Sequence, residues 1–262
     1  MARLSSLLGN LLGRVDGLRN GLPRLIAAER PPLIYAVGDV HGCLDPLKAL
    51  EARILADAAD ISGEKWLVML GDYVDRGPLS AQVLDHLIGA PLPGFRRICL
   101  RGNHDAAMLA ALEDADALDA WLGWGVEPTL ASYDMDPAEI GSVTGPGRAS
   151  DRLQLLRMFI PDEHVAFLRE LPVLLSVPGY TFVHAGLRPG IAIERQSDHD
   201  LLWIRDEFLK ADHDFGAVVI HGHTPADEPF LSARRVGIDT ACFASGRLTA
   251  VRVADDGLTL VG

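Results

Sequence analysis

Five short motifs along the chain combine histidine, aspartate or asparagine with glycine. They are Gly38-Asp39-Val40-His41-Gly42, Gly71-Asp72, Gly102-Asn103-His104, His184-Ala185-Gly186 and His221-Gly222-His223. Carboxylate, imidazole and amide oxygen atoms are ligands for Mn, Fe or Zn, and the motifs contain no thiolate, which argues against a structural zinc site. Asp72 stands centrally in the order, so it could bridge two ions. Two divalent cations about 3.5–4 Å apart form the arrangement used for hydrolytic displacement at phosphorus.

A short β-rich run precedes each motif, so the motifs are expected at the ends of buried strands. The runs cover residues 33–37, 66–70, 98–100, 180–183 and 218–220. Helical patterns between them cover residues 45–59, 80–88, 105–112, 152–159 and 162–169. This alternation predicts an α/β fold, in which sites assemble at the carboxyl ends of strands. Residues 134–150 are expected to form a surface loop, and residues 236–239, 248–253 and 258–261 antiparallel strands.

Composition and charge exclude several classes of protein. The 262 residues are 48% hydrophobic and 23% charged, which excludes a disordered or collagen-like chain. The net charge of -12 disfavours non-specific nucleic-acid binding. No apolar run is long enough to predict a transmembrane helix. Three widely spaced cysteines, Cys43, Cys99 and Cys242, are expected to be reduced thiols in a cytoplasmic protein.

The first 28 residues have a pattern of their own. Leucines recur there at helical spacing among arginines, which predicts a basic amphipathic helix over residues 1–28. Such a helix could dock on its own domain, bind a partner or a second copy, or lie on a membrane surface. Gly9, Gly13 and Gly17 lower the stability expected of an isolated helix. Residues 29–262 are expected to form a single catalytic domain.

The ordered motifs resemble those of the calcineurin-like metallophosphoesterases. The element Gly71-Asp72-Tyr73-Val74-Asp75-Arg76-Gly77 is similar to that of the phosphoprotein phosphatase (PPP) family, in its bacterial serine/threonine phosphatase branch. The resemblance spans residues 38–223 and implies one catalytic domain. It implies an α/β fold with two mixed sheets in a β-sandwich, flanked by α-helices. A dinuclear metal site would lie at the carboxyl ends of the strands.

The resemblance also implies a role for each motif residue. The first metal would be held by Asp39, His41 and Asp72, and the second by Asp72 as a bridge with Asn103, His184 and His223. Mn²⁺ is the first expectation for both ions, with Fe or Zn as alternatives. A hydroxide bridging the two metals would attack phosphorus directly.

The same resemblance assigns the groups that handle the proton and the phosphate. His104 would be the general acid for the leaving oxygen, oriented by Asp75. Arg76 and Arg101 would bind the phosphoryl oxygens, because guanidinium matches phosphate geometry and stays charged. Arg205 could join them or form a surface salt bridge with Asp206 or Glu207. His221 is expected to have a structural or supporting role rather than to bind metal.

Two positions depart from related patterns. Asp105 stands where the family usually has glutamate, which puts its hydrogen-bonding reach in doubt. Pro225 stands where nuclease and phosphodiesterase relatives carry a further histidine, which favours a phosphatase. The sequence therefore predicts a metal-dependent phosphomonoesterase acting on phosphoserine or phosphothreonine in proteins or peptides, with phosphotyrosine as a further substrate.

Three other functions compete with this prediction. The first is a dinucleoside polyphosphate hydrolase such as a diadenosine tetraphosphate hydrolase. Such relatives typically carry glutamine where His41 stands, so His41 favours the phosphatase. The second is a small-molecule phosphatase. The third is a binding module without activity, which the complete set of expected ligands disfavours.

Overall fold

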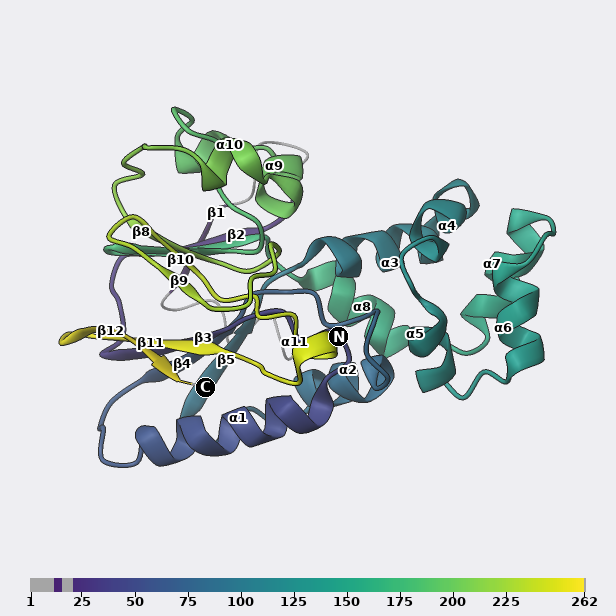
Figure 1. Cartoon of the computed structure of the whole chain (residues 1–262), viewed down its shortest axis with the longest axis horizontal. Helices are drawn as coiled ribbons and strands as arrows, with labels where there is room; N and C mark the ends of the chain where they lie inside the picture. The colour runs from purple at the N-terminus through teal and green to yellow at the C-terminus, as the bar shows by residue number, and fades with distance from the viewer. Residues whose placement is uncertain (1–11, 16–20, 262) are drawn as a thin grey trace.

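Two β-sheets lie face to face in the computed structural model, which describes residues 12–15 and 21–261 (Figure 1). The five-stranded sheet has the order β12-β11-β3-β4-β5, with β3 (Leu33–Val37), β4 (Lys65–Met69), β5 (Phe95–Cys99), β11 (Ala250–Ala254) and β12 (Gly257–Val261). The seven-stranded sheet has the order β1-β2-β6-β7-β8-β10-β9, with β1 (Leu12–Val15), β2 (Arg24–Ala27), β6 (Leu174–Val177), β7 (Tyr180–Val183), β8 (Val218–His221), β9 (Phe230–Leu231) and β10 (Arg235–Gly237). Both sheets mix parallel and antiparallel pairs, so the predicted α/β fold with two mixed sheets is confirmed.

The central strands β3 and β4 are buried on both faces, which explains their continuous apolar runs. In β3, Leu33, Tyr35 and Val37 pack on the outer helices, whereas Ile34 and Ala36 face the other sheet. This alternation follows from the two-residue period of a strand. The core between the sheets also contains side chains from both of them, among them Trp66, Val68, Ile98, Leu175, Phe182, Ile220 and Val251.

Helices cover the outer faces of both sheets. The five-stranded sheet packs against α1 (Leu44–Asp57) and α2 (Ser80–Ile88). The seven-stranded sheet packs against α9 (Asp198–Trp203) and α10 (Asp206–Leu209) (Figure 1). Two short elements complete this part, the 3-10 turn Ile193–Arg195 and α11 (Cys242–Ser245). Among the helices of the described residues, none is both long and apolar enough to cross a membrane.

Six helices between β5 and β6 extend to one side of the sheets (Figure 1). They are α3 (Asn103–Glu113), α4 (Ala115–Leu122), α5 (Glu127–Ser132), α6 (Pro137–Thr144), α7 (Ala149–Arg157) and α8 (Asp162–Glu170). The expected loop over residues 134–150 is wrong, because α6 lies within it. Asp136 caps α6 by accepting hydrogen bonds from Ala138 N and Glu139 N, and Pro137 occupies the first turn.

The predicted N-terminal helix is wrong where residues 1–28 are described. Residues 12–15 form β1 antiparallel to β2, and β2 pairs in parallel with β6. The pairing of β2 with β6 is stabilised by Leu25 and Ala27, which pack in the core between the sheets. The buried Arg24 guanidinium also lies 2.8 Å from the Asp198 carboxylate. The rest of the predicted helix lies at residues 1–11 and 16–20, outside the described residues. The division into an extension and a catalytic domain stays a prediction, although β2 belongs to the sheet.

We therefore expect Leu25→Ala to destabilise the protein by about 2–4 kcal/mol, because it leaves a cavity between the sheets. A chain that starts at Glu29 should lose still more stability, since β6 also loses its parallel partner. Leu260→Ala is the control, because that leucine is 44% exposed on β12. Denaturant unfolding measures all three. Equal stability of the Leu25 and Leu260 variants would contradict a structural role for β2.

Candidate active site

The loops that follow the strands bring the six predicted metal ligands into one buried cluster. Each ligand side chain belongs to a residue that is at most 5% exposed: Asp39, His41, Asp72, Asn103, His184 and His223. They come from the ends of β3, β4, β5, β7 and β8, so strands of both sheets contribute.

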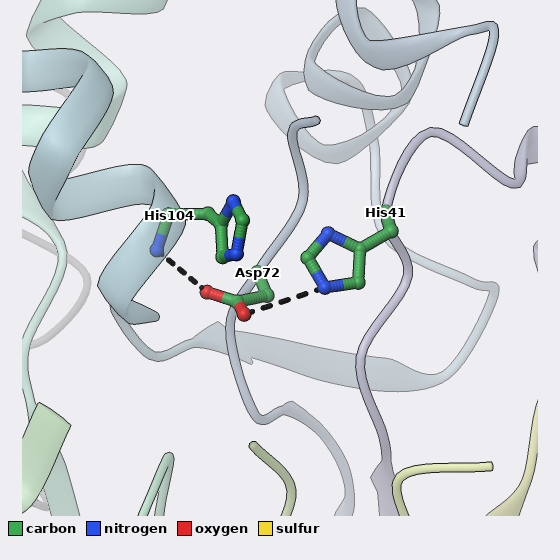
Figure 2. Close-up of side chains that lie close together, drawn as sticks. All are labelled: His41, Asp72 and His104. Atoms are coloured by element: carbon green, nitrogen blue, oxygen red, sulfur yellow. Dashed lines mark hydrogen bonds and ion pairs between the residues drawn. The ribbon is translucent and has the colours of Figure 1, made fainter. Parts of the chain in front are cut away.

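Asp72 contacts several members of this cluster, and Figure 2 shows its carboxylate between His41 and His104. One carboxylate oxygen, Oδ2, lies 3.4 Å from His41 Nε2 and 3.5 Å from His184 Nε2. The other, Oδ1, accepts a 2.9 Å hydrogen bond from the backbone N–H of His104. Burial acts to raise the pKa of Asp72, but its interactions with His184, His104 and His41, together with the hydrogen bond from the His104 backbone N–H, lower it below its usual range. The carboxylate therefore stays charged and faces two imidazoles.

The backbone decides which nitrogen of each imidazole carries the proton. His41 Nδ1 lies 2.7 Å from Val74 O, and His184 Nδ1 lies 3.0 Å from Leu70 O. A carbonyl only accepts hydrogen bonds, so in both rings Nδ1 carries the proton and the Nε2 lone pair faces Asp72. Burial lowers the pKa of His41 to about 4 and also lowers that of His184. Both rings are thus neutral, as metal ligands must be.

A second group of ligand atoms converges on Asn103. Its Oδ1 atom lies 2.8 Å from His184 Nε2 and 2.9 Å from His223 Nδ1. The His223 backbone N–H donates to Asp39 at 3.0 Å, which ties the ends of β8 and β3 together. His223 Nε2 is buried, and the described residues give it no hydrogen-bond partner. Burial, with His184 and Arg205 nearby, lowers the pKa of His223 to about 2.

The cluster holds more buried negative charge than its neutral histidines can balance. Asp39 and Asp72 are joined by Asp239, which is 4% exposed and follows β10. Burial and the charges of Asp239 and Asp72 raise the pKa of Asp39 well above its usual value. Oxygen atoms of Asp39 and Asp72 and a nitrogen of His184 all lie within 4.8 Å of one another. Uncompensated acids and facing lone pairs fit a divalent cation site.

Glycine is required where the backbone passes these carboxylates. A Cβ atom at Gly102 would lie 2.1 Å from Asp72 Oδ1, and one at Gly222 would clash with the Asp39 carboxylate. Non-glycine residues in the left-handed region also gather here, among them His41, Asp72, Asp75, Arg76 and His223. Such strain concentrates at functional sites.

His104 and Asp75 form the predicted acid pair. His104 Nδ1 lies 2.8 Å from Asp75 Oδ2, and both residues are buried. Burial acts to lower the pKa of His104, but the Asp75 hydrogen bond and the charges of Asp72 and Asp75 outweigh it and raise that pKa. Asp75 is held further by the Trp121 indole N–H at 3.0 Å and the Thr129 hydroxyl at 3.0 Å.

The three predicted phosphate-binding arginines are placed differently. Arg76 extends its guanidinium across the site, with one nitrogen 3.1 Å from His41 Nε2 and another 3.1 Å from His104 Nε2. Arg205 is exposed, and its charge acts on His223, so it lies beside the cluster. The structure does not bring Arg101 to the cluster. Its guanidinium donates to Leu168 O and Arg169 O, in the last turn of α8, where carbonyls lack helical partners.

Two further sequence predictions concern supporting residues. Asp105 is long enough to work in place of glutamate, because it accepts from the backbone N–H groups of Asp72, Tyr73 and Gly102 at 2.8–2.9 Å. His221 is buried against Phe208, with Nδ1 3.0 Å from Gly222 O. Its ring packs in the layer between β8 and α10, in agreement with a structural role.

Sequence reasoning missed three residues of the site. Asp239 is the last residue of the predicted strand over residues 236–239, but the observed strand β10 ends at Gly237, so Asp239 follows it as the other acids follow their strands. Trp121 and Thr129 carry no such signal, since they come from the helices α4 and α5, far from Asp75 in sequence.

Comparison with known proteins places this site in a family. The family described as "Calcineurin-like phosphoesterase" matches residues 32–247. The chain belongs to this family. The match covers every predicted site residue from Asp39 to His223, so the expected superfamily is confirmed.

Curated relatives of this calcineurin-like phosphoesterase include two kinds of bis(5'-nucleosyl)-tetraphosphatase. A symmetrical bis(5'-nucleosyl)-tetraphosphatase of Nitrosococcus oceani is 32% identical over 60% of this chain and 44% of its own length. An asymmetrical bis(5'-nucleosyl)-tetraphosphatase of Anoxybacillus flavithermus is 25% identical over 84% of this chain and 90% of its own length. The chain thus spans less than half of the first of these relatives.

Solved structures share the fold. A chain provisionally named a diadenosine tetraphosphatase superposes with a TM-score of 0.61 at 21% identity, covering 90% of this chain and 96% of the other. A serine/threonine phosphatase of Saccharomyces cerevisiae superposes with a TM-score of 0.53 at 15% identity, covering 87% of this chain and 78% of the other.

These comparisons correct one expectation. The expected phosphoprotein or phosphopeptide substrate is wrong, because the matching curated relatives are named for nucleosyl tetraphosphates. The narrower assignment to the PPP branch is likewise not supported.

The glycine at the centre of the site gives a direct test. We expect Gly102→Ala to lose bound metal and about 1–3 kcal/mol of stability, because its Cβ would overlap the Asp72 carboxylate. Gly141→Ala is the control, since that position is an exposed helical site with free space and should gain up to about 1 kcal/mol. Metal content and unfolding are measured for both variants. Full metal occupancy in Gly102→Ala would contradict the placement of Asp72 as a ligand.

Proposed function

We propose that this chain is a metal-dependent hydrolase of dinucleoside polyphosphates, with diadenosine tetraphosphate as the representative substrate. The observation that carries the proposal is its similarity to the bis(5'-nucleosyl)-tetraphosphatase relatives. The buried ligand cluster supports it, because Asp, His and Asn side chains that could hold divalent cations lie together with the His104–Asp75 pair and Arg76 beside them.

Two divalent cations would be held at the cluster. We assign one to Asp39, His41 and Asp72, and the other to Asp72 with the ligands Asn103, His184 and His223, and we expect Mn²⁺ before Fe or Zn. When bound, such a pair supplies Lewis-acid activation of the phosphoryl group and of the attacking water.

The protein's own residues would orient the polyphosphate and move a proton. Arg76 and Arg205 would bind phosphoryl oxygens beside the cluster. His104 Nδ1 is bound to Asp75, so its other nitrogen, Nε2, faces the site near Arg76. An imidazolium at this position, stabilised by Asp75, can give its Nε2 proton to the leaving phosphate oxygen.

Parallel assays with three substrates test the proposal. We expect Mn²⁺-dependent cleavage of diadenosine tetraphosphate, preferred over a phosphoserine or phosphothreonine peptide and over p-nitrophenyl phosphate, with EDTA as the control. Cleavage of p-nitrophenyl phosphate without the dinucleotide would instead indicate a small-molecule phosphatase and would refute the proposal.

The hydrogen bonds to Asp75 give a second test. Thr129→Val removes the hydroxyl at nearly constant volume, and Trp121→Phe removes the indole N–H. We expect each to lower turnover of phenyl phosphate about tenfold, with a smaller loss on p-nitrophenyl phosphate, whose leaving group needs no proton.

His104→Ala is the reference for this test and should show the same selectivity with a loss of about 10²–10⁴-fold. Metal content should be unchanged in all three variants. Equal losses on both substrates would contradict the acid role of the pair.

A further inference from the structure

Partly exposed aromatic side chains flank the ligand cluster on two sides. On one side, Trp124 and Trp203 are half-buried, whereas Trp66 and Trp121 are at most 2% exposed. On the other side, Phe243 is 40% exposed. Trp124 and Trp203 pack partly against the hydrophobic core, but part of each ring remains exposed, as does Phe243.

The Trp124 and Trp203 rings form a wall beside the acid and the second group of ligands. Trp124 lies between α4 and α5, and Trp203 ends α9, so the wall joins the helical extension to the seven-stranded sheet's helices. Their ring centroids are 5.2 Å apart. Trp124 contacts the His104 ring at 5.0 Å, and Trp203 contacts the His223 ring at 6.3 Å.

Phe243 lies beside the opposite part of the cluster. Its ring centroid is 5.5 Å from that of His41, and the Arg76 guanidinium carbon lies 4.9 Å from it. Phe243 is carried by the short helix α11, which follows Ala241 in a left-handed conformation with φ of 49°. Cys242, the residue before Phe243, is buried and fixes this turn. The strained backbone of Ala241 therefore lies next to the segment that places Phe243 beside the site.

A series of ring contacts through His41 and His104 connects the two surfaces. The Phe243 ring contacts the His41 ring, and the His41 and His104 ring centroids are 4.7 Å apart. The His104 ring in turn contacts Trp124. Two imidazoles, one of a metal ligand and one of the acid, therefore lie between the phenyl ring and the indoles. A substrate that reached both surfaces would place its central part over the cluster.

We infer that Trp124 with Trp203 on one side and Phe243 on the other are stacking surfaces for the two nucleobases of a dinucleoside polyphosphate. The inference rests on the proposed function and adds the recognition of the bases to it. Nucleobases stack on aromatic side chains whatever their sequence, because every base has a π-face. The polyphosphate between them would lie along Arg76 and the ligand cluster.

Substitution of each surface tests the inference. We expect Trp203→Leu and Phe243→Leu each to raise KM for diadenosine tetraphosphate about tenfold, which corresponds to about 1.4 kcal/mol. The double variant should raise KM for diadenosine tetraphosphate about 100-fold, because the two surfaces act independently. KM for inorganic tripolyphosphate, which has no base, should change less than about twofold.

Three controls separate stacking from structural damage. Trp203→Phe and Phe243→Tyr keep a ring and should keep KM near that of the unmodified protein. Phe230→Leu removes another exposed phenyl ring that lies under an arginine, Arg235, but on edge strand β9, and should leave both KM values unchanged. Metal content is measured in every variant. Equal losses on tripolyphosphate and on the dinucleotide would overturn the inference.

A binding arm keeps the inference independent of the cleavage assay. ADP and pyrophosphate are compared as inhibitors of p-nitrophenyl phosphate hydrolysis in the unmodified protein and in Trp203→Leu and Phe243→Leu. Tighter inhibition by ADP, reduced in at least one variant, would support base stacking even if diadenosine tetraphosphate were not cleaved, in which case the proposed function alone would fail. Equal inhibition by ADP and pyrophosphate in the unmodified protein would refute the stacking surfaces.

Discussion

The buried carboxylate of Asp72 is the constraint on which the site depends. It faces the Nε2 atoms of His41 and His184, whose Nδ1 atoms donate to backbone carbonyls. Burial lowers the pKa of both rings and keeps them neutral. Two further acids, Asp39 and Asp239, lie in the same dry cluster. A bound cation would balance these charges, and glycine beside the carboxylates of Asp72 and Asp39 lets the backbone pass close to both of them.

The sheets and the helices between β5 and β6 contribute different parts of the site. The sheets supply the ligands, because strand ends are rigid and deliver side chains to one edge. The helices between β5 and β6 supply the surroundings of the acid pair, since Trp121 and Thr129 complete the hydrogen bonds of Asp75. The groups that hold Asp75 therefore come from a different part of the fold than the strand-end residues of the cluster.

The choice between phosphatase and dinucleotide hydrolase illustrates which residues carry specificity. His41 was expected to favour a phosphatase. Its ring lies in the buried cluster with Nε2 facing Asp72, so in the proposed function it would contact the cation beside the phosphoryl group, which monoesters and polyphosphate anhydrides share. Discrimination belongs to groups farther from the reacting atom, and the partly exposed rings of Trp124, Trp203 and Phe243 are such groups.

The sequence by itself determined the α/β class, the strands that precede Asp39, Asp72 and His184, and the family. The reason is that metal ligation needs particular residue types beside glycine at strand ends. Tertiary structure decided what local patterns do not encode. The leucine spacing of residues 1–28 predicted a helix, but pairing with β6 made a strand of residues 24–27. Arg101 matched a phosphate-binding motif, but its guanidinium donates hydrogen bonds to carbonyls in the last turn of α8. Trp121 reaches Asp75 across 46 residues of chain, a contact that only the packing of α4 against the site creates.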